Sequence, residues 1–156
     1  IYRRNSAGKY KKIAKLSASV TSYKDKKLVT GNTYSYKIRT YTVSGGKTHK
    51  SSFSAAASAK VVPKRVKSVS AMALQENSAV VRWKRDKRVT GYQVYKKSNI
   101  QLKYSRVRTT KKNTVVKFTD GKAVSGYTYY YKVRSYKVVY GKKIYGKYSK
   151  VVSLSK

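Results

Sequence analysis

The chain repeats itself at an interval of 95 residues, and this repeat limits the possible folds more than any other feature. The segment GNTYSYKIRTYTVSGGK (31–47) aligns with GYTYYYKVRSYKVVYGK (126–142), and their glycine, tyrosine and basic positions coincide. Near the start of the chain, IYRR (1–4) parallels VYKK (94–97) with a small drift in the interval. Further agreement is found at Asp25/Asp120 and at Phe53-Ser54/Tyr148-Ser149. The fold must therefore be one structural unit used twice.

Both copies have the alternation of β-strands. In the second copy Tyr129, Tyr131 and Val133 share one face of an extended segment, whereas Tyr130 and Lys132 share the other. The segments SAVVRW (78–83) and YQVYKK (92–97) are also expected to be strands, and turn residues stand at Gly45-Gly46, Asp120-Gly121 and Tyr140-Gly141. No segment has a helical pattern. Short strands at this spacing predict an all-β fold, an antiparallel β-sandwich.

The alignment also predicts the domain organisation. The second copy, 63–156, is expected to be a complete domain, and Pro63 in VVPKR marks the link to the first. The first copy, 1–62, begins at the position equivalent to Val94, so it is expected to be a partial domain without its first two strands. About thirty residues equivalent to 64–93 would then come either from a longer chain, the favoured alternative, or from a partner chain by strand addition.

Particular residues resemble those of fibronectin type III domains of the kind found in secreted proteins of Gram-positive bacteria. Trp83 in VVRWKR matches the tryptophan of the second strand of that family. The third-strand motif G-Y-x-V-Y is matched by Gly91, Tyr92, Val94 and Tyr95. The sixth-strand motif G-x-x-Y-x-Y-x-V-x-A is matched by Gly126, Tyr129, Tyr131 and Val133, with Ser135 in place of the final alanine. The ending YGKYSKVVSLS resembles the last strand of the family.

This resemblance implies an immunoglobulin-like sandwich and two tyrosine corners. Tyr129 and its counterpart Tyr34 would each bond through the hydroxyl to nearby backbone. Ala123 departs from the leucine usual in the loop before the sixth strand, whereas Leu28 keeps it in the first copy. The family serves as spacers, adhesins and accessory domains of hydrolases, so the fold alone does not define a function.

The charge balance is the strongest indication of function. The chain has 39 Lys and Arg against 4 Asp and Glu, a formal net charge of +35. The charge is spread along both copies, at +13 over residues 1–63 and +22 over residues 64–156. Ordinary solvation would mix the signs, whereas such a surface attracts polyanions in a salt-dependent way. The expected partners are anionic polymers, namely cell-wall polymer, sulfated glycan or nucleic acid bound without sequence specificity, or else an acidic protein surface or anionic membrane.

Residues for catalysis are few. The acids Asp25, Glu76, Asp86 and Asp120 are scattered, and the equivalence of Asp25 and Asp120 favours turn or loop-capping roles. His49 is the only histidine, and the chain has no cysteine. We therefore expect no enzyme, no cofactor and no metal site. No apolar run reaches the ~20 residues of a membrane helix, and the opening IYRRNSAGKY is not a signal peptide.

Alternation predicts a row of cations and tyrosines on the outer face of the second copy. Tyrosine rings offer stacking faces, and the cations between them attract phosphate or sulfate. The alternative interpretation is that outward tyrosines pack across strands of any sheet and that a basic row is solvated. The expected polyanion-binding residues are Tyr95, Lys97, Tyr130, Lys132, Arg134, Tyr136, Lys142, Lys143 and Lys147.

The leading hypothesis is a non-enzymatic, extracellular or cell-surface module that binds anionic polymers or surfaces. The alternatives are a structural spacer or assembly subunit that docks an acidic partner in a filament or particle, a nucleic-acid-compacting protein, and an accessory domain of a larger secreted hydrolase. No zinc-finger, helix-turn-helix or other sequence-reading motif is present, so readout of base sequence is not expected.

Overall fold

The computed structural model describes residues 1–5, 8–75 and 77–156. Its secondary structure is all β, every strand pairing is antiparallel, and no helix occurs among the described residues, which confirms the predicted fold class. The chain divides into two compact units, Ile1–Val61 (unit 1) and Val62–Lys156 (unit 2).

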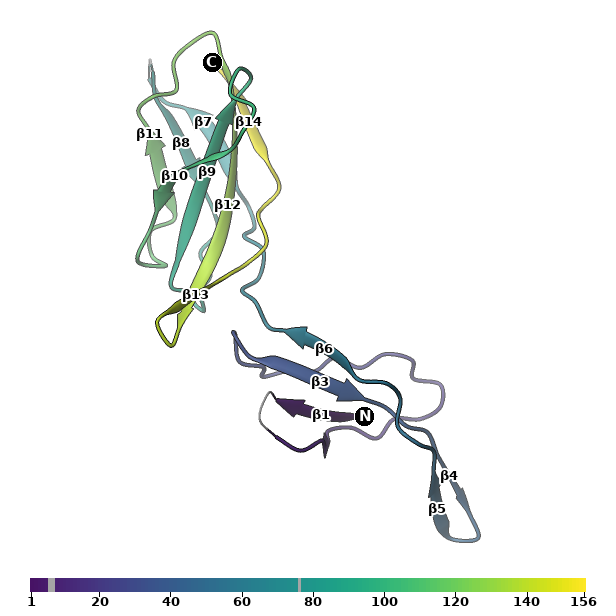
Figure 1. The fold of residues 1–156 in the computed structure, drawn as a ribbon. Coiled ribbons are helices and arrows are strands. Elements are labelled where there is room, and N and C mark those ends of the chain that lie inside the picture. Colours follow the sequence, from purple (N-terminus) through teal and green to yellow (C-terminus); the bar gives the residue numbers. More distant parts are fainter. Residues whose placement is uncertain (6–7, 76) are drawn as a thin grey trace. The chain divides into compact units, whose positions relative to one another are not determined.

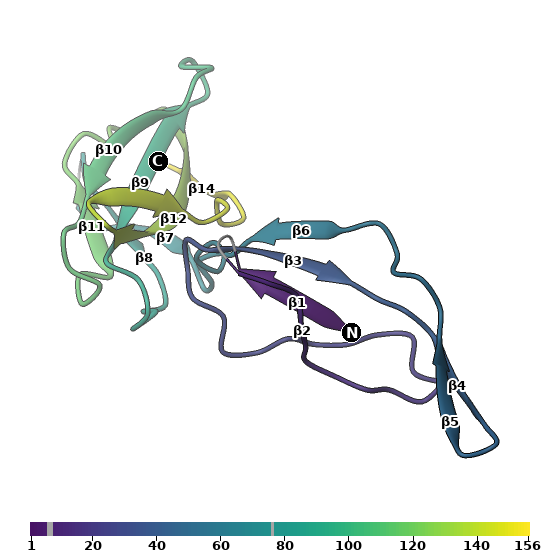
Figure 2. The same cartoon turned by 60° about the horizontal axis from the view of Figure 1, so that its bottom comes forward.

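Unit 2 contains two antiparallel sheets (Figures 1 and 2). The larger has the order β10-β9-β12-β13, with β14 also paired to β12, and the smaller has the order β11-β8-β7. The strands are β7 (Ser70–Ala73), β8 (Ala79–Arg82), β9 (Gly91–Ser98), β10 (Ser105–Thr109), β11 (Lys117–Asp120), β12 (Thr128–Val139), β13 (Lys142–Tyr145) and β14 (Val152–Ser155). The two sheets lie face to face as a sandwich.

The core of unit 2 lies between these sheets and follows the alternation of β12. Tyr129 is 5% exposed, and Tyr131 and Val133 are fully buried, as predicted. From the other sheet and its continuation, Val81 and Trp83 join the same buried cluster. Since each inward side chain is followed by an outward one, β12 exposes its other face to the solvent side of the larger sheet.

The predicted tyrosine corners are present in both units. The backbone N–H of Val124 donates to the hydroxyl of Tyr129 over 3.0 Å, and that of Val29 donates to the hydroxyl of Tyr34 over 3.2 Å. Ala123, which stands where a leucine was expected, is fully buried, and its N–H donates to the carbonyl of Asn77. The smaller side chain is thus accommodated by close approach of the β7–β8 turn.

Unit 1 has one sheet of order β2-β1-β3-β6 and a separate β4-β5 hairpin, which projects from the sheet in Figures 1 and 2. Its strands are β1 (Tyr2–Asn5), β2 (Lys11–Lys12), β3 (Thr33–Lys37), β4 (Tyr41–Ser44), β5 (Lys47–Lys50) and β6 (Ala57–Lys60). Within residues 1–5 and 8–61, no strands correspond to the smaller sheet of unit 2, and only Tyr34 is buried. The inner face of this sheet is therefore largely open.

Candidate polyanion-binding surface

The outer face of the β9–β12 pair places cations beside aromatic and amide side chains. In the antiparallel register Tyr130 lies opposite Lys97, Lys132 opposite Tyr95, and Arg134 opposite Gln93. Side chains directly opposite one another in such a pair are close enough to interact. Together with rings from neighbouring segments they form what we call the basic–aromatic face, made of Gln93, Tyr95, Lys97, Tyr104, Tyr130, Lys132, Arg134, Tyr145 and Tyr148.

Arg134 occupies the middle of this face and is held in one orientation. Its Nε donates to Oε1 of Gln93 over 2.9 Å, and Nη2 donates to the hydroxyl of Tyr95 over 2.8 Å. Its Cζ lies 4.1 Å from the ring centre of Tyr145 and 4.9 Å from that of Tyr148. A guanidinium that stacks on aromatic rings keeps its positive charge. None of the contacts described for Arg134 is with a carboxylate.

The two lysines of the face rest on tyrosine rings. Nζ of Lys132 lies 3.8 Å from the ring centre of Tyr104 and 4.4 Å from that of Tyr148. Nζ of Lys97 lies 5.0 Å from the ring centre of Tyr130 and 5.4 Å from that of Tyr104. Burial raises the pKa of Tyr104, so this ring stays neutral beside the cations.

Unit 1 repeats the arginine cluster at equivalent positions. Cζ of Arg39 lies 4.9 Å from the ring centre of Tyr2 and 4.4 Å from that of Phe53, and Nη2 donates to the hydroxyl of Tyr2 over 2.6 Å. That hydrogen bond lowers the pKa of Tyr2. The rings of Tyr2 and Phe53 meet edge to face at 4.8 Å, as Tyr95 and Tyr148 do at 5.1 Å in unit 2.

The lysine cluster is repeated as well. The ring of Tyr10 receives Cζ of Arg4 at 5.0 Å and Nζ of Lys37 at 5.2 Å. These three residues correspond to Tyr104, Lys97 and Lys132 in unit 2. The basic–aromatic face therefore has a second copy, made of Tyr2, Arg4, Tyr10, Lys37, Arg39 and Phe53.

The described acids are engaged elsewhere. Asp25 pairs with Arg3 at 2.9 Å, and its counterpart Asp120 pairs with Lys96 at 2.6 Å. Asp120 also accepts from the hydroxyl of Tyr131 at 2.7 Å and from the N–H of Lys122, the loop-capping contact that was predicted. Burial raises the pKa of Asp120, but the hydrogen bonds from Lys96 and Tyr131 outweigh it, so the pKa lies below its usual value.

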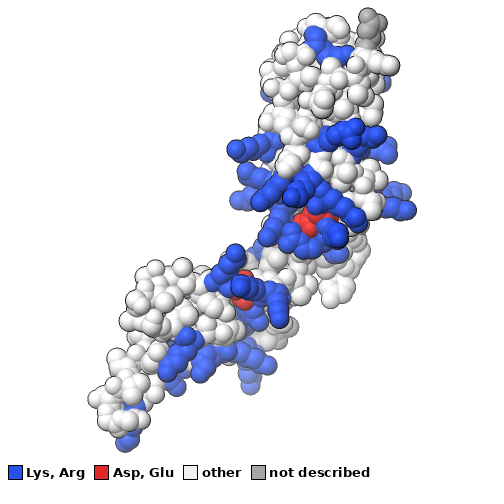
Figure 3. All heavy atoms as spheres, turned by 180° about the vertical axis from the view of Figure 1, so that it is seen from behind, with Lys and Arg blue, Asp and Glu red and all other residues white. Residues whose placement is uncertain are grey.

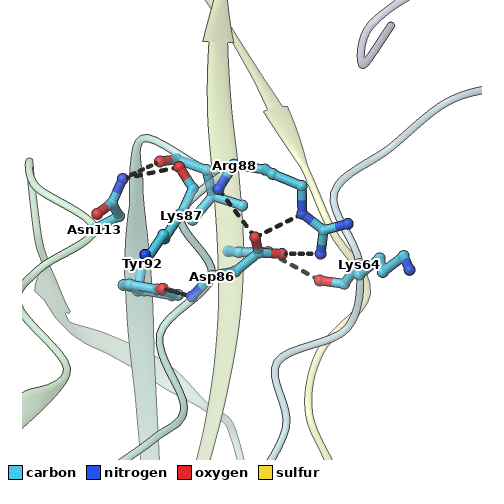
Figure 4. Close-up of polar contacts among 8 residues, drawn as sticks. Lys64, Asp86, Lys87, Arg88, Tyr92 and Asn113 are labelled. Atoms are coloured by element: carbon cyan, nitrogen blue, oxygen red, sulfur yellow. Dashed lines mark hydrogen bonds and ion pairs between the residues drawn. The ribbon is translucent and has the colours of Figure 1, made fainter. Parts of the chain in front are cut away.

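Asp86 lies in the β8–β9 loop and makes hydrogen bonds within it (Figure 4). Its carboxylate accepts from the guanidinium of Arg88 at 2.7 Å and from the N–H of the same residue at 3.0 Å, and the Arg88 hydrogen bond holds the pKa of Asp86 below its usual range. The N–H of Asp86 donates to the hydroxyl of Tyr92 over 2.7 Å, and Nδ2 of Asn113 donates to the carbonyl of Val89 over 2.9 Å. This cluster fixes a loop next to the core.

Basic side chains are also distributed widely outside the face. Figure 3 shows the molecule from behind, with Lys and Arg gathered on both units and few acidic atoms among them. No group of three potential metal-binding residues occurs in the described ranges, and His49 is exposed on β5. Glu76 lies outside the described residues. No helix in the described part of the chain is long and apolar enough to span a membrane.

Five of the predicted site residues lie together on the basic–aromatic face: Tyr95, Lys97, Tyr130, Lys132 and Arg134. Lys142 and Lys143 are exposed on β13, and Lys147 is exposed in the segment before β14.

The prediction that Tyr136 points to solvent is wrong. This side chain is 2% exposed, and its hydroxyl donates to the carbonyl of Thr110 over 2.8 Å. It has the outward parity of Arg134, but the segment after β10 and the ring of Tyr145 cover it. Nζ of Lys143 lies 5.1 Å from its ring centre, so the exposed group at this position is the lysine.

The sequence reasoning missed Gln93, Tyr104, Tyr145 and Tyr148. Tyr148 was detectable, because its counterpart Phe53 is aromatic in the first copy. Tyr104 was also detectable, because the first copy has Tyr10 at the same place. Gln93 and Tyr145 gave no such signal, since their contacts to Arg134 depend on strand pairing.

Solved structures with this fold are fibronectin type III domains. A two-domain segment of chicken tenascin is 22% identical, with a TM-score of 0.58, over 99% of this chain and 82% of that one. The FN1–FN3 domains of chicken CNTN1 are 17% identical, with a TM-score of 0.51, over 99% of this chain and 52% of that one. No family model and no curated protein matches the sequence. The protein thus has the fibronectin type III fold.

Proposed function

We propose that this protein is a non-enzymatic extracellular or cell-surface module that binds anionic polymers through the basic–aromatic face of each unit. The observation that carries the proposal is the recurrence of the face. Arg39 and Arg134 each stack on aromatic rings and bond a tyrosine hydroxyl, at equivalent places in the two copies.

The chemistry of the face fits a polymer with repeated anionic groups. Cations that rest on rings remain available to phosphate or sulfate, because the described carboxylates are paired with Arg3, Arg88 and Lys96 instead. The half-buried rings of the face present edges and faces to the sugars or bases between the anions. A net charge of +35 draws such a polymer to the protein from a distance.

Strand geometry supports a ligand that is contacted along its length. Tyr130, Lys132 and Arg134 follow one another at every second residue of β12, which places successive side chains about 7 Å apart. A compact acidic ligand would need the cations to converge on one point, whereas here they form a row.

The test is binding of the full chain to heparin, duplex DNA and a teichoic-acid-type polymer at several salt concentrations. We expect all three to bind, with log K falling steeply and linearly against log salt. If none of the three polymers binds at about 0.15 M salt, the proposal is overturned. Binding of an acidic protein under conditions where no polymer binds would likewise overturn it and favour an assembly subunit.

A further inference from the structure

The turn of the β12–β13 hairpin carries a tyrosine in a strained backbone conformation. Tyr140 has a φ of 47° and is 97% exposed. The first copy has Gly45 at this position, with a φ of 57°, and no described atom lies within 4 Å of where a Cβ would stand. The turn therefore requires a positive φ, which glycine adopts without strain, and does not require a ring. A bulky residue kept in such a conformation is typical of binding sites.

The ring of Tyr140 is free, whereas the rings of the basic–aromatic face are partly covered by cations. Nζ of Lys97 lies 5.0 Å from the ring centre of Tyr130, and Nζ of Lys132 lies 3.8 Å from that of Tyr104. At 97% exposure, neither face of the Tyr140 ring is covered. A planar group can therefore stack on this ring without displacing a cation.

The hairpin continues the outer row of β12 beyond the neighbouring strand. In the described structure β12 pairs with β9 as far as Tyr136, and from Lys137 to Val139 it pairs with β13 instead. The hairpin accordingly extends past the end of β9 (Figure 1). At about 3.3 Å per residue, Tyr140 lies within about 20 Å of Arg134 along the strand. A polymer that follows the row of cations toward the hairpin therefore reaches the free ring.

Two further segments bring cations to this end of unit 2. The N–H of Val138 donates to Oγ1 of Thr90 over 3.0 Å, which joins the hairpin to the β8–β9 loop. In that loop, Nε of Arg85 donates to Oδ1 of Asn113 over 3.0 Å, which joins the loop to the segment between β10 and β11. Asp86, the acid of the β8–β9 loop, is already engaged in an ion pair. The exposed cations of the three segments include Lys84, Arg85, Lys87, Lys111, Lys112 and Lys142.

Single-stranded nucleic acid combines the two groups that this end of unit 2 can bind, planar rings and anions. Its unpaired bases can stack on an aromatic side chain, whereas the bases of a duplex stack on one another and sulfated glycans have no aromatic ring. A bilayer is a poorer fit, because membrane anchors bury a broad apolar surface. Here a single ring is followed by Gly141, Lys142 and Lys143.

We propose that Tyr140 stacks on an unpaired base and makes this chain favour single-stranded nucleic acid among the anionic polymers. The cations of the three segments attract the phosphates on either side of that base. Every base has a π face, so the contact reads no sequence. The inference rests on the proposed polymer binding and adds the class of polymer.

The experiment measures binding of the full chain to an oligothymidylate of about 20 nucleotides, which exceeds the site of about 4–16 nucleotides of an OB fold. An abasic oligomer of the same length and charge, and heparin, are the control ligands, all at about 0.15 M salt. The unmodified chain should bind the oligothymidylate about tenfold more tightly than the abasic oligomer. Tyr140→Asn removes the ring and tolerates the positive φ. It should lose about tenfold in affinity for the oligothymidylate alone, with an unchanged salt slope because no charge is removed.

Two further variants make the result specific. Tyr140→Trp keeps a stacking ring and should retain the affinity, whereas Tyr23→Asn removes a tyrosine of unit 1 that is 42% exposed and should have no effect. Unchanged affinity of Tyr140→Asn for the oligothymidylate, or equal losses on the two oligomers, would overturn the inference and leave polymer binding intact. A larger loss on phosphatidylserine vesicles would overturn it in favour of a membrane anchor. If the unmodified chain binds neither heparin nor either oligomer, the proposed function fails as well.

Discussion

The outer surfaces of unit 1 and unit 2 share the arginine and lysine clusters, whereas the inner surfaces of their sheets differ. Arg39 and Arg134 make matching contacts with a tyrosine hydroxyl and two rings. On the inner side, Ile38 is 56% exposed where Val133 is fully buried. The basic–aromatic face is therefore built on the β1–β3 and β9–β12 pairs together with rings from neighbouring segments, whereas the core requires the second sheet.

The largest difference between the units should appear when core-facing side chains are removed. Trp83→Ala leaves a cavity in the centre of unit 2 and should cost about 3–5 kcal/mol of unfolding free energy. Ile38→Ala removes a side chain that is 56% exposed and should change stability by less than about 0.5 kcal/mol. Urea unfolding followed by unit-specific NMR signals measures both, and similar losses would show that the inner face of unit 1 is covered in solution.

A smaller difference is expected at the tyrosines that bond the equivalent aspartates. Tyr131→Phe leaves the buried carboxylate of Asp120 short of one donor and should cost about 1.5–3 kcal/mol. Tyr36→Phe should cost about 0.5–1.5 kcal/mol, since water can replace the lost hydroxyl beside Asp25 in the more open unit. Burial and the hydrogen bond to Asp25 raise the pKa of Tyr36 to about 12. Equal costs in urea unfolding would contradict the comparison.

The stability of unit 2 should fall in acid because Asp120 is paired in the folded protein. The pKa of this group is lower in the folded protein than in the unfolded chain, so its contribution to stability is present above about pH 4 and is lost as the pH falls through the folded pKa. We expect the melting temperature of unit 2 to fall below pH 4 and to fall less in Asp120→Asn. Asp25→Asn is the matched control, and it should leave the acid dependence of unit 2 unchanged.

The smallest effect concerns the hairpin turns. Tyr140 adopts a positive φ of 47° and is 97% exposed, whereas the first copy has Gly45 there at 57°. Since a bulky residue in this conformation is strained and asparagine tolerates it, Tyr140→Asn should stabilise unit 2 by up to about 1 kcal/mol. A loss of stability in thermal melts would show that the exposed ring makes contacts that offset the strain.

Alternation along the chain predicted most of the fold. It placed Tyr129, Tyr131 and Val133 inside the sandwich because the side chains of a strand change face at every residue. The prediction failed at Tyr136, because alternation gives the face of the sheet on which a side chain lies but not which other residues cover that side chain. It also left out Gln93 and Tyr145, which reach Arg134 only through strand pairings distant in sequence.

The central claim is that the basic–aromatic face, rather than charge alone, binds the polymer. The direct measurement compares heparin affinity of Lys132→Gln/Arg134→Gln with that of Arg82→Gln/Lys117→Gln, a control that removes the same charge from exposed positions paired across β8 and β11. Thermal melts check that both variants fold. We predict that the first variant loses about tenfold more affinity than the control and that its salt slope falls by about 2. Equal losses of affinity in the two variants would contradict the account.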